Sequence, residues 1–153
     1  MPGRLPADPA AFVAAAERAV NTRDVEAWCA AYAPGITLDA TTDGAHEQHV
    51  GAAAARVAVT GYLAGMQATG FRLAKTLVVA GDGVLVNRWT SDFRGRRRGH
   101  GIETWHFDAA GLVDRHEMLT FFDVRPSQSV VARARLGLAY PRIALAFLKA
   151  TRG

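Results

Sequence analysis

Residues 99–118, GHGIETWHFDAAGLVDRHEM, combine acidic, imidazole and large aromatic side chains at alternating positions. Glu103, Trp105 and Phe107 are spaced by two, so a β-strand would place all three on one face. A carboxyl group held between aromatic rings loses its water, and desolvation favours the neutral acid. In that form Glu103 could donate a hydrogen bond to a carbonyl group or act as a general acid near neutral pH.

A second interpretation keeps the head of Glu103 in water. In that case the side chain stands at the rim of a hydrophobic surface, or pairs with Arg72 or Arg115. The sequence leaves both interpretations open, because the aromatic neighbours indicate a face of the strand but not its depth.

The strand before Glu103 supplies the rest of the same face. With a turn centred near Arg96, Trp89 lies opposite Glu103 and Asn87 lies opposite Trp105. The face that carries the aromatic residues should point inward, whereas the other face is mostly polar. The inward set is Asn87, Trp89, Ser91, Glu103, Trp105 and Phe107. The outward set is Arg88, Thr90, Asp92, His100, Thr104 and His106.

Three further side chains are candidates for chemistry or binding. On the last strand His116 and Thr120 share a face, and His116 is a candidate base that would complement Glu103. A surface imidazole is the alternative for His116. Asp39 is a third candidate for catalysis, placed at the pocket mouth. His46 and His49 have no evident third ligand, so no metal site is predicted.

The pattern along the chain predicts three helices followed by an antiparallel meander. The helical segments are 8–20, 25–33 and 51–70, with a short break at NTRD, and the first begins with Asp8 as N-cap and Pro9 at the first helical position. Segment 36–43 reads as a strand followed by a polar loop. From Phe71 the period changes to two, which predicts strands at 71–80, 83–93, 101–107 and 112–124.

Composition and charge limit the function classes. Half of the 153 residues are hydrophobic, which is typical of a globular protein. The first twenty residues lack the continuous apolar segment of a signal peptide, and the single cysteine, Cys29, allows no disulfide within the chain, so we expect a cytoplasmic protein. Cys29 itself is predicted to be a buried, inert thiol. The body is nearly neutral, which argues against nucleic-acid binding. The basic run RGRRRG, 94–99, reads as a solvated hairpin tip, with an anion-binding loop as the alternative.

The last segment is basic and forms a separate helical extension in this interpretation. It contains Arg125, Arg133, Arg135, Arg142, Lys149 and Arg152 and no acid after Asp123. Pro141 divides it into two short helical pieces. Packing on the body or on a second copy is the favoured hypothesis, and contact with an anionic membrane is the alternative.

The order of these elements resembles the nuclear transport factor 2-like superfamily, which includes ketosteroid isomerases, SnoaL-like polyketide cyclases and limonene-type epoxide hydrolases. The stretches that carry the resemblance are AVNTRDVEAWCAAYAPGITLD, VVAGDGVLVNRW and IETWHFDAAGLVDRHEM. The resemblance implies an α+β domain over residues 8–125, in which a cone-shaped, curved antiparallel sheet wraps around the N-terminal helices and encloses an apolar pocket. Residues 126–153 then form the basic C-terminal extension.

The catalytic residues of these relatives are matched only in part. The resemblance places Glu103 where ketosteroid isomerases carry a protonated Asp, but Ala40 and Ala16 stand where the isomerases have a base and a tyrosine. Of the Asp-Arg-Asp set of the limonene-type hydrolases, Arg88 matches the arginine, whereas Thr90 replaces the first acid. Neither mechanism transfers as it stands.

Two functional hypotheses follow. The first is a small cyclase or isomerase, or a hydrolase, that acts by general acid–base catalysis on an apolar carbonyl- or epoxide-bearing metabolite. It would use Glu103, His116 and Asp39 without metal or organic cofactor, and Trp89, Trp105, Asn87, Thr120 and Phe107 would contact the ligand. The second is a non-catalytic ligand-binding or dimerisation module of the same fold. The family resemblance also implies a homodimer.

Overall fold

The computed structural model describes residues 3–93, 96–122, 129–142 and 145, and the chain divides into two compact units, residues 1–123 and 124–153. The described part of the first unit contains three helices and six strands. They are α1 (Pro9–Thr22), α2 (Val25–Cys29), β1 (Tyr32–Thr42), β2 (Ala45–Val50), α3 (Ala52–Thr69), β3 (Phe71–Gly81), β4 (Val84–Phe93), β5 (Arg96–Phe107) and β6 (Val113–Phe121). The second unit contains α4 (Val130–Ala139).

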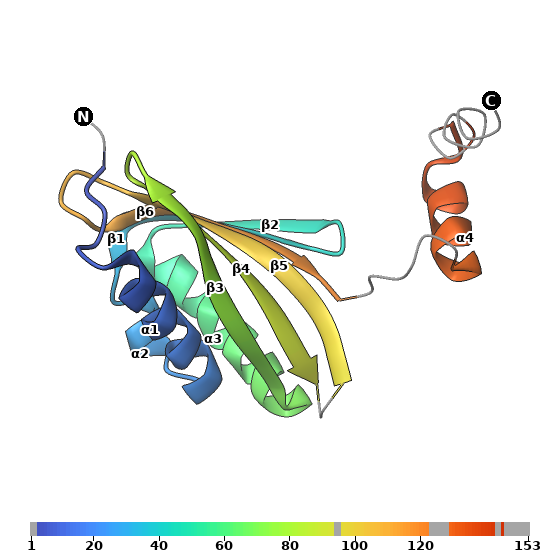
Figure 1. The fold of residues 1–153 in the computed structure, drawn as a ribbon, viewed down its shortest axis with the longest axis horizontal. Coiled ribbons are helices and arrows are strands. Elements are labelled where there is room, and N and C mark those ends of the chain that lie inside the picture. Colours follow the sequence, from blue (N-terminus) through green and yellow to red (C-terminus); the bar gives the residue numbers. More distant parts are fainter. Residues whose placement is uncertain (1–2, 94–95, 123–128, 143–144, 146–153) are drawn as a thin grey trace. The chain divides into compact units, whose positions relative to one another are not determined.

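The six strands form one curved, open sheet in the order β2-β1-β6-β5-β4-β3, and the helices α1, α2 and α3 lie against one of its faces (Figure 1). Neighbouring strands are antiparallel except β1 and β6, which are parallel. The predicted α+β class, with a meander from β3 to β6, is therefore confirmed. The hydrophobic core lies between the helices and the sheet, where Ile36, Leu38 and Leu85 are fully buried.

Helix α1 holds the edge of the sheet. Its N-terminus is closed as the sequence predicts, because the side chain of Asp8 accepts a hydrogen bond from the backbone N–H of Ala11 at 2.9 Å. Edge strand β3 has unpaired backbone groups that need partners. Asn21 accepts from the N–H of Leu73 at 3.0 Å and donates to its carbonyl at 2.8 Å. The side chains of α1 thus replace a neighbouring strand.

Two elements between residues 25 and 50 differ from the prediction. Helix α2 ends at Cys29 instead of continuing to residue 33, and the chain enters β1 at Tyr32. The polar segment expected as a loop is strand β2, which pairs with β1 through a hairpin at Asp43 and Gly44, both with positive φ. Because β2 is an exposed edge strand, it lacks the alternating apolar residues from which a strand is recognised.

The predicted face of the β4–β5 hairpin is correct, but its register is wrong by two residues. Asn87, not Trp89, lies opposite Glu103, and Trp89 lies opposite Gly101. A Cβ atom on Gly101 would come within 2.5 Å of the Trp89 indole and 2.2 Å of the Leu119 carbonyl oxygen, so only glycine lets this indole cross β5. The hairpin closes at Phe93 and Arg96, and the rest of the basic tip, residues 94–95, lies outside the described residues.

The C-terminal unit confirms only part of what its sequence predicts. Helix α4 ends before Pro141, as expected from a residue that interrupts helices. Most of the second predicted piece lies outside the described residues. Among the helices that the structure does describe, none is long and apolar enough to cross a membrane.

Arg23 joins three elements and generates a stability prediction. It has φ 64° at the end of α1, and its guanidinium donates to the carbonyls of Val20, Met66 and Phe71. We expect Arg23→Gly to lower the free energy of unfolding by about 2 kcal/mol, because the lost hydrogen bonds outweigh the relief of the left-handed backbone. Urea denaturation measures the change.

Asp82 is the matched control, since it also has a positive φ, 50°, in the β3–β4 turn. We expect Asp82→Gly to be neutral or stabilising by up to about 1 kcal/mol. If both variants behaved alike, the guanidinium of Arg23 would not hold these elements together.

Candidate functional site

An apolar cavity of about 380 Å³ lies between helix α3 and the inner face of the sheet. From the helices, Trp28, Tyr62, Gly65 and Met66 line it, and from the sheet Trp89, Glu103, Met118 and Thr120 are among the lining residues. Glu103 is the one carboxylate in the described wall of this cavity. The cavity therefore presents a single acid to a mostly apolar ligand.

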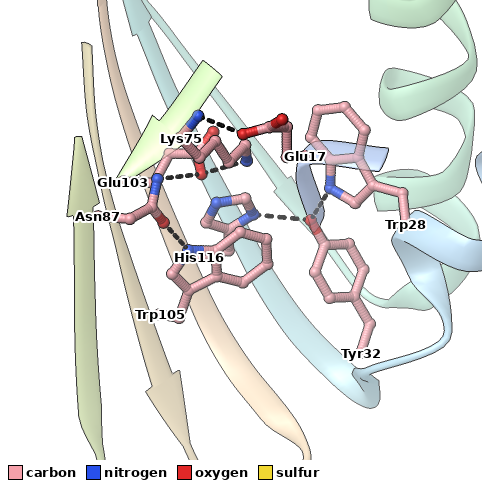
Figure 2. A network of polar contacts seen from close by, with 8 residues as sticks. All are labelled: Glu17, Trp28, Tyr32, Lys75, Asn87, Glu103, Trp105 and His116. Atoms are coloured by element: carbon pink, nitrogen blue, oxygen red, sulfur yellow. Dashed lines mark hydrogen bonds and ion pairs between the residues drawn. The ribbon is translucent and has the colours of Figure 1, made fainter. Parts of the chain in front are cut away.

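Two donors hold the carboxylate of Glu103 by the same oxygen. The ammonium of Lys75 donates to Oε2 at 2.5 Å, and the amide of Asn87 donates to Oε2 at 3.0 Å (Figure 2). Within the described part of the chain, Oε1 has no hydrogen-bond partner. Because Glu103 also lines the cavity, Oε1 is the oxygen left for a ligand.

Lys75 is completely buried. Its side chain is 0% exposed, and the Glu103 side chain is 3% exposed. The ammonium lies 5.7 Å from the ring centroid of Trp28 and 5.4 Å from that of Trp105, within range of cation–π attraction. Its backbone N–H donates to Glu17 of α1 at 2.6 Å. A buried charge requires such partners, because an isolated ammonium in the interior is strongly unfavourable.

A second chain of contacts runs behind Glu103. Asn87 accepts a hydrogen bond from the indole N–H of Trp105 at 2.7 Å, so its amide is fixed at both ends. Trp105 stacks on the imidazole of His116 with 3.5 Å between ring centroids and 17° between planes. This stacking closes the inner wall against the core.

His116 and Tyr32 form a buried pair beneath that stack. The hydroxyl of Tyr32 lies 2.7 Å from His116 Nδ1 and accepts from the indole N–H of Trp28 at 2.8 Å. The Tyr32 O–H is then directed at Nδ1, which leaves the imidazole proton on Nε2. Burial, together with the charge of Lys75, lowers the pKa of His116 well below its usual value. Burial likewise raises the pKa of Tyr32 well above its usual value.

The predicted site residues separate into three groups. Glu103, Trp89 and Thr120 line the cavity together. Asn87, Trp105 and His116 are fully or almost fully buried and support that wall from behind it. Phe107 packs against Phe12 of α1 in the core, with ring centroids 5.3 Å apart. Asn87, Trp105 and Phe107, which the sequence predicts to contact a ligand, are thus not among the residues that line this cavity.

Asp39 does not stand at the cavity mouth. Ala40 lines the cavity, and successive residues of a strand point to opposite faces, so Asp39 lies on the outer face of β1. There its carboxylate accepts from Gln48 at 2.8 Å and pairs with Arg115 at 3.1 Å. Asp39 was expected at the pocket mouth, but Ala40 takes the inward position on β1 and Asp39 faces outward.

Sequence reasoning missed Lys75, the partner that contacts the pocket acid. A signal was present, because Phe71, Leu73 and Lys75 alternate along β3 and share its inward face. From the sequence alone, a lysine on that face interrupts the apolar pattern, because the buried carboxylate that it contacts lies on a strand further along the chain. Among the described residues no group of three His, Cys, Asp or Glu side chains is placed to bind a metal ion.

A SnoaL-like domain model matches residues 12–116, more than half of the chain. The chain belongs to the SnoaL-like family. The resemblance inferred from the order of elements is therefore confirmed. No curated protein sequence matches the chain.

Solved structures share the fold of this SnoaL-like protein at low identity. A steroid delta-isomerase from Pseudomonas aeruginosa is 21% identical, with 95% of this chain and 97% of that chain covered and a TM-score of 0.55. A SnoaL-like protein of unknown function from Burkholderia thailandensis is 16% identical, with coverages of 76% and 98% and a TM-score of 0.60. The epoxide hydrolase/cyclase-like enzyme SalBIII is 16% identical, with coverages of 76% and 91% and a TM-score of 0.56.

The buried imidazole of this SnoaL-like protein makes its stability depend on pH. Because the folded pKa of His116 is lowered, the unfolded chain takes up the proton first as pH falls. The contribution of the neutral His116 to the free energy of unfolding is thus fully present above the unfolded pKa of about 6.5, and it decreases as pH falls below that value. Between about pH 8 and about pH 5, the wild type should lose about 2 kcal/mol more than His116→Gln.

Urea denaturation across this range measures the difference in slope. His100 is exposed, and His100→Gln should keep the wild-type slope. Equal slopes for the wild type and His116→Gln would contradict a buried neutral imidazole.

Proposed function

We propose that the protein is a cofactor-independent isomerase or cyclase that acts by acid–base catalysis on an apolar, carbonyl-bearing metabolite. The observation that carries the proposal is a carboxylate in the wall of a mostly apolar cavity, held on one oxygen by a buried ammonium and an amide, while its other oxygen has no partner among the described residues. The isomerase and the epoxide hydrolase/cyclase-like enzyme among its structural neighbours support this class of reaction.

Glu103 is the group that touches the ligand in this mechanism. Its carboxylate removes a proton from the carbon beside the carbonyl group, and the electron pair passes to the carbonyl oxygen as an enolate forms. Return of the proton from Glu103 to another carbon completes an isomerisation. For a ring closure, the enolate carbon attacks a second carbonyl or epoxide carbon of the same molecule. The electron pair of the C–O bond that breaks passes to its oxygen, which takes the proton back from Glu103. Thr42 and Thr120 supply hydroxyl groups in the wall that can donate to the enolate oxygen.

Binding without turnover is the second candidate function. The specific observation in its favour is that the ammonium of Lys75 already neutralises Glu103, inside a cavity whose wall is mostly apolar. Such a cavity suits a neutral ligand even when no proton moves. The two functions differ in whether a bound ligand exchanges its acidic protons.

Proton exchange in D₂O provides the test, because it reports proton abstraction before the product is known. The probes are apolar cyclic ketones of increasing size. The rate of exchange is measured from the loss of their α-proton signals in NMR spectra. We expect the wild type to accelerate exchange and Glu103→Gln to lower the rate about 100-fold or more. Binding, measured by quenching of tryptophan fluorescence, should persist in the variant.

Glu117→Gln is the matched control. Glu117 is a glutamate of the same sheet that pairs with Arg115 on the outer face, and its replacement should leave exchange unchanged. Binding of the ketones without exchange in the wild type would select the non-catalytic function. Absence of both binding and exchange over the whole size range would contradict the proposal.

Gly65 sets the width of the cavity at its α3 side. It lines the cavity, and an added Cβ would meet no atom within 4 Å, so a larger side chain has space to enter. Gly65→Leu should weaken binding of the largest bound ketone about tenfold or more and spare the smallest. Fluorescence titration across the size series measures this change.

Gly61 of the same helix is the matched control, because a Cβ there also meets nothing within 4 Å and Gly61 is not part of the cavity wall. Both leucine variants should raise the free energy of unfolding by about 0.8 kcal/mol through helix propensity. An equal effect of the two variants on ketone affinity would show that Gly65 does not limit the ligand.

A further inference from the structure

Lys75 is placed to do more than neutralise a buried charge. Its ammonium binds Glu103 on Oε2 and leaves Oε1 to the cavity, and it does not itself line the cavity. It is therefore kept from the ligand while it fixes the group that meets the ligand. The indoles of Trp28 and Trp105 lie 5.7 Å and 5.4 Å from the ammonium, so its position is determined from two further directions.

Four elements packed around Glu103 contribute titratable side chains other than Lys75. Tyr32 from β1 and His116 from β6 are buried and stay uncharged near neutral pH, because burial raises the pKa of the first and lowers that of the second. Tyr62 from α3 donates to Glu47, and burial raises its pKa as well. Glu17 from α1 accepts from the backbone of β3. Among the described residues, Lys75 is the cation that contacts Glu103.

We propose that Lys75 is the positioning residue of the site, which holds Glu103 as an ionised carboxylate with Oε1 presented to the ligand at neutral pH. The inference rests on the proposed function and goes beyond it by naming the ligand group that Oε1 accepts. An ionised carboxylate has no proton to donate, so the ligand must offer it an acidic C–H, an O–H or an N–H. The carbonyl oxygen of the ligand then points away from Glu103, toward the hydroxyl groups of the wall.

The first measurement needs no ligand. In protein labelled with ¹³C at the glutamate carboxyl groups, the Glu103 signal is assigned by its loss in Glu103→Gln and followed against pH. The wild-type signal should be that of a carboxylate at neutral pH. A signal of the neutral acid at neutral pH in the wild type would overturn the proposal, whether or not any ketone is turned over.

The second measurement separates charge from packing. Lys75→Met keeps much of the volume and removes the charge, so Glu103 should become a neutral acid at neutral pH. The acid limb of the ketone exchange rate should move to higher pH, and the rate at neutral pH should fall about tenfold or more. A variant that keeps the wild-type carboxyl signal and the wild-type pH profile would show that Lys75 only fills space.

Chemical rescue gives the matched control. Lys75→Ala removes three carbon atoms and the ammonium, a gap that n-propylammonium fills with a charge and propan-1-ol fills without one. We expect n-propylammonium to restore the carboxylate signal and the exchange rate, and propan-1-ol to restore neither. Equal rescue by both compounds would overturn the positioning role. Loss of exchange in every form, with the carboxyl signals as expected, would reject the proposed function and leave Lys75 in its role.

Discussion

A buried ammonium is the constraint on which the inner wall of this protein depends. The side chain of Lys75 has no exposed surface, and a charge without water needs partners supplied by the fold itself. The partners of its ammonium come from one strand and one helix: the carboxylate of Glu103 and the indole of Trp105 on β5, and the indole of Trp28 on α2. Removal of one partner would leave the other charge buried without compensation, which is more costly than the loss of an exposed pair.

This requirement explains the arrangement of neighbouring groups that have no charge. Asn87 uses its amide hydrogens for Glu103 and its oxygen for Trp105, so the two donors on Oε2 approach from fixed directions. The Trp105 indole is held in place by its stacking on His116. Gly101 removes the side chain that would otherwise collide with Trp89. Packing and hydrogen bonding thus limit the same carboxylate to one orientation toward the cavity.

Much of the fold follows from local patterns in the sequence, whereas the site depends on contacts between distant segments. Period-two alternation from Phe71 onward predicts the meander, and Asp8 with Pro9 predicts the start of α1. Strand β2 escaped prediction because its exposed edge carries no apolar alternation. The two-residue error in the hairpin register preserved every face, since a shift by two restores the alternation. It nevertheless paired Glu103 with Trp89 instead of Asn87.

The same distinction decides the chemistry of the pocket acid. From the sequence, Glu103 stands between aromatic residues, and desolvation alone would make it a neutral hydrogen-bond donor, like the protonated Asp that the resemblance to ketosteroid isomerases implies at this strand position. The structure adds Lys75, which lies 28 residues away in sequence and contacts Oε2. An adjacent ammonium favours the charged form of a carboxyl group, and in the proposed mechanism that form is the acceptor and the base. In the proposed mechanism, one cation from the edge strand β3, which β4 separates from β5, reverses the direction in which the proton moves, although the strand position and the shape of the fold are shared.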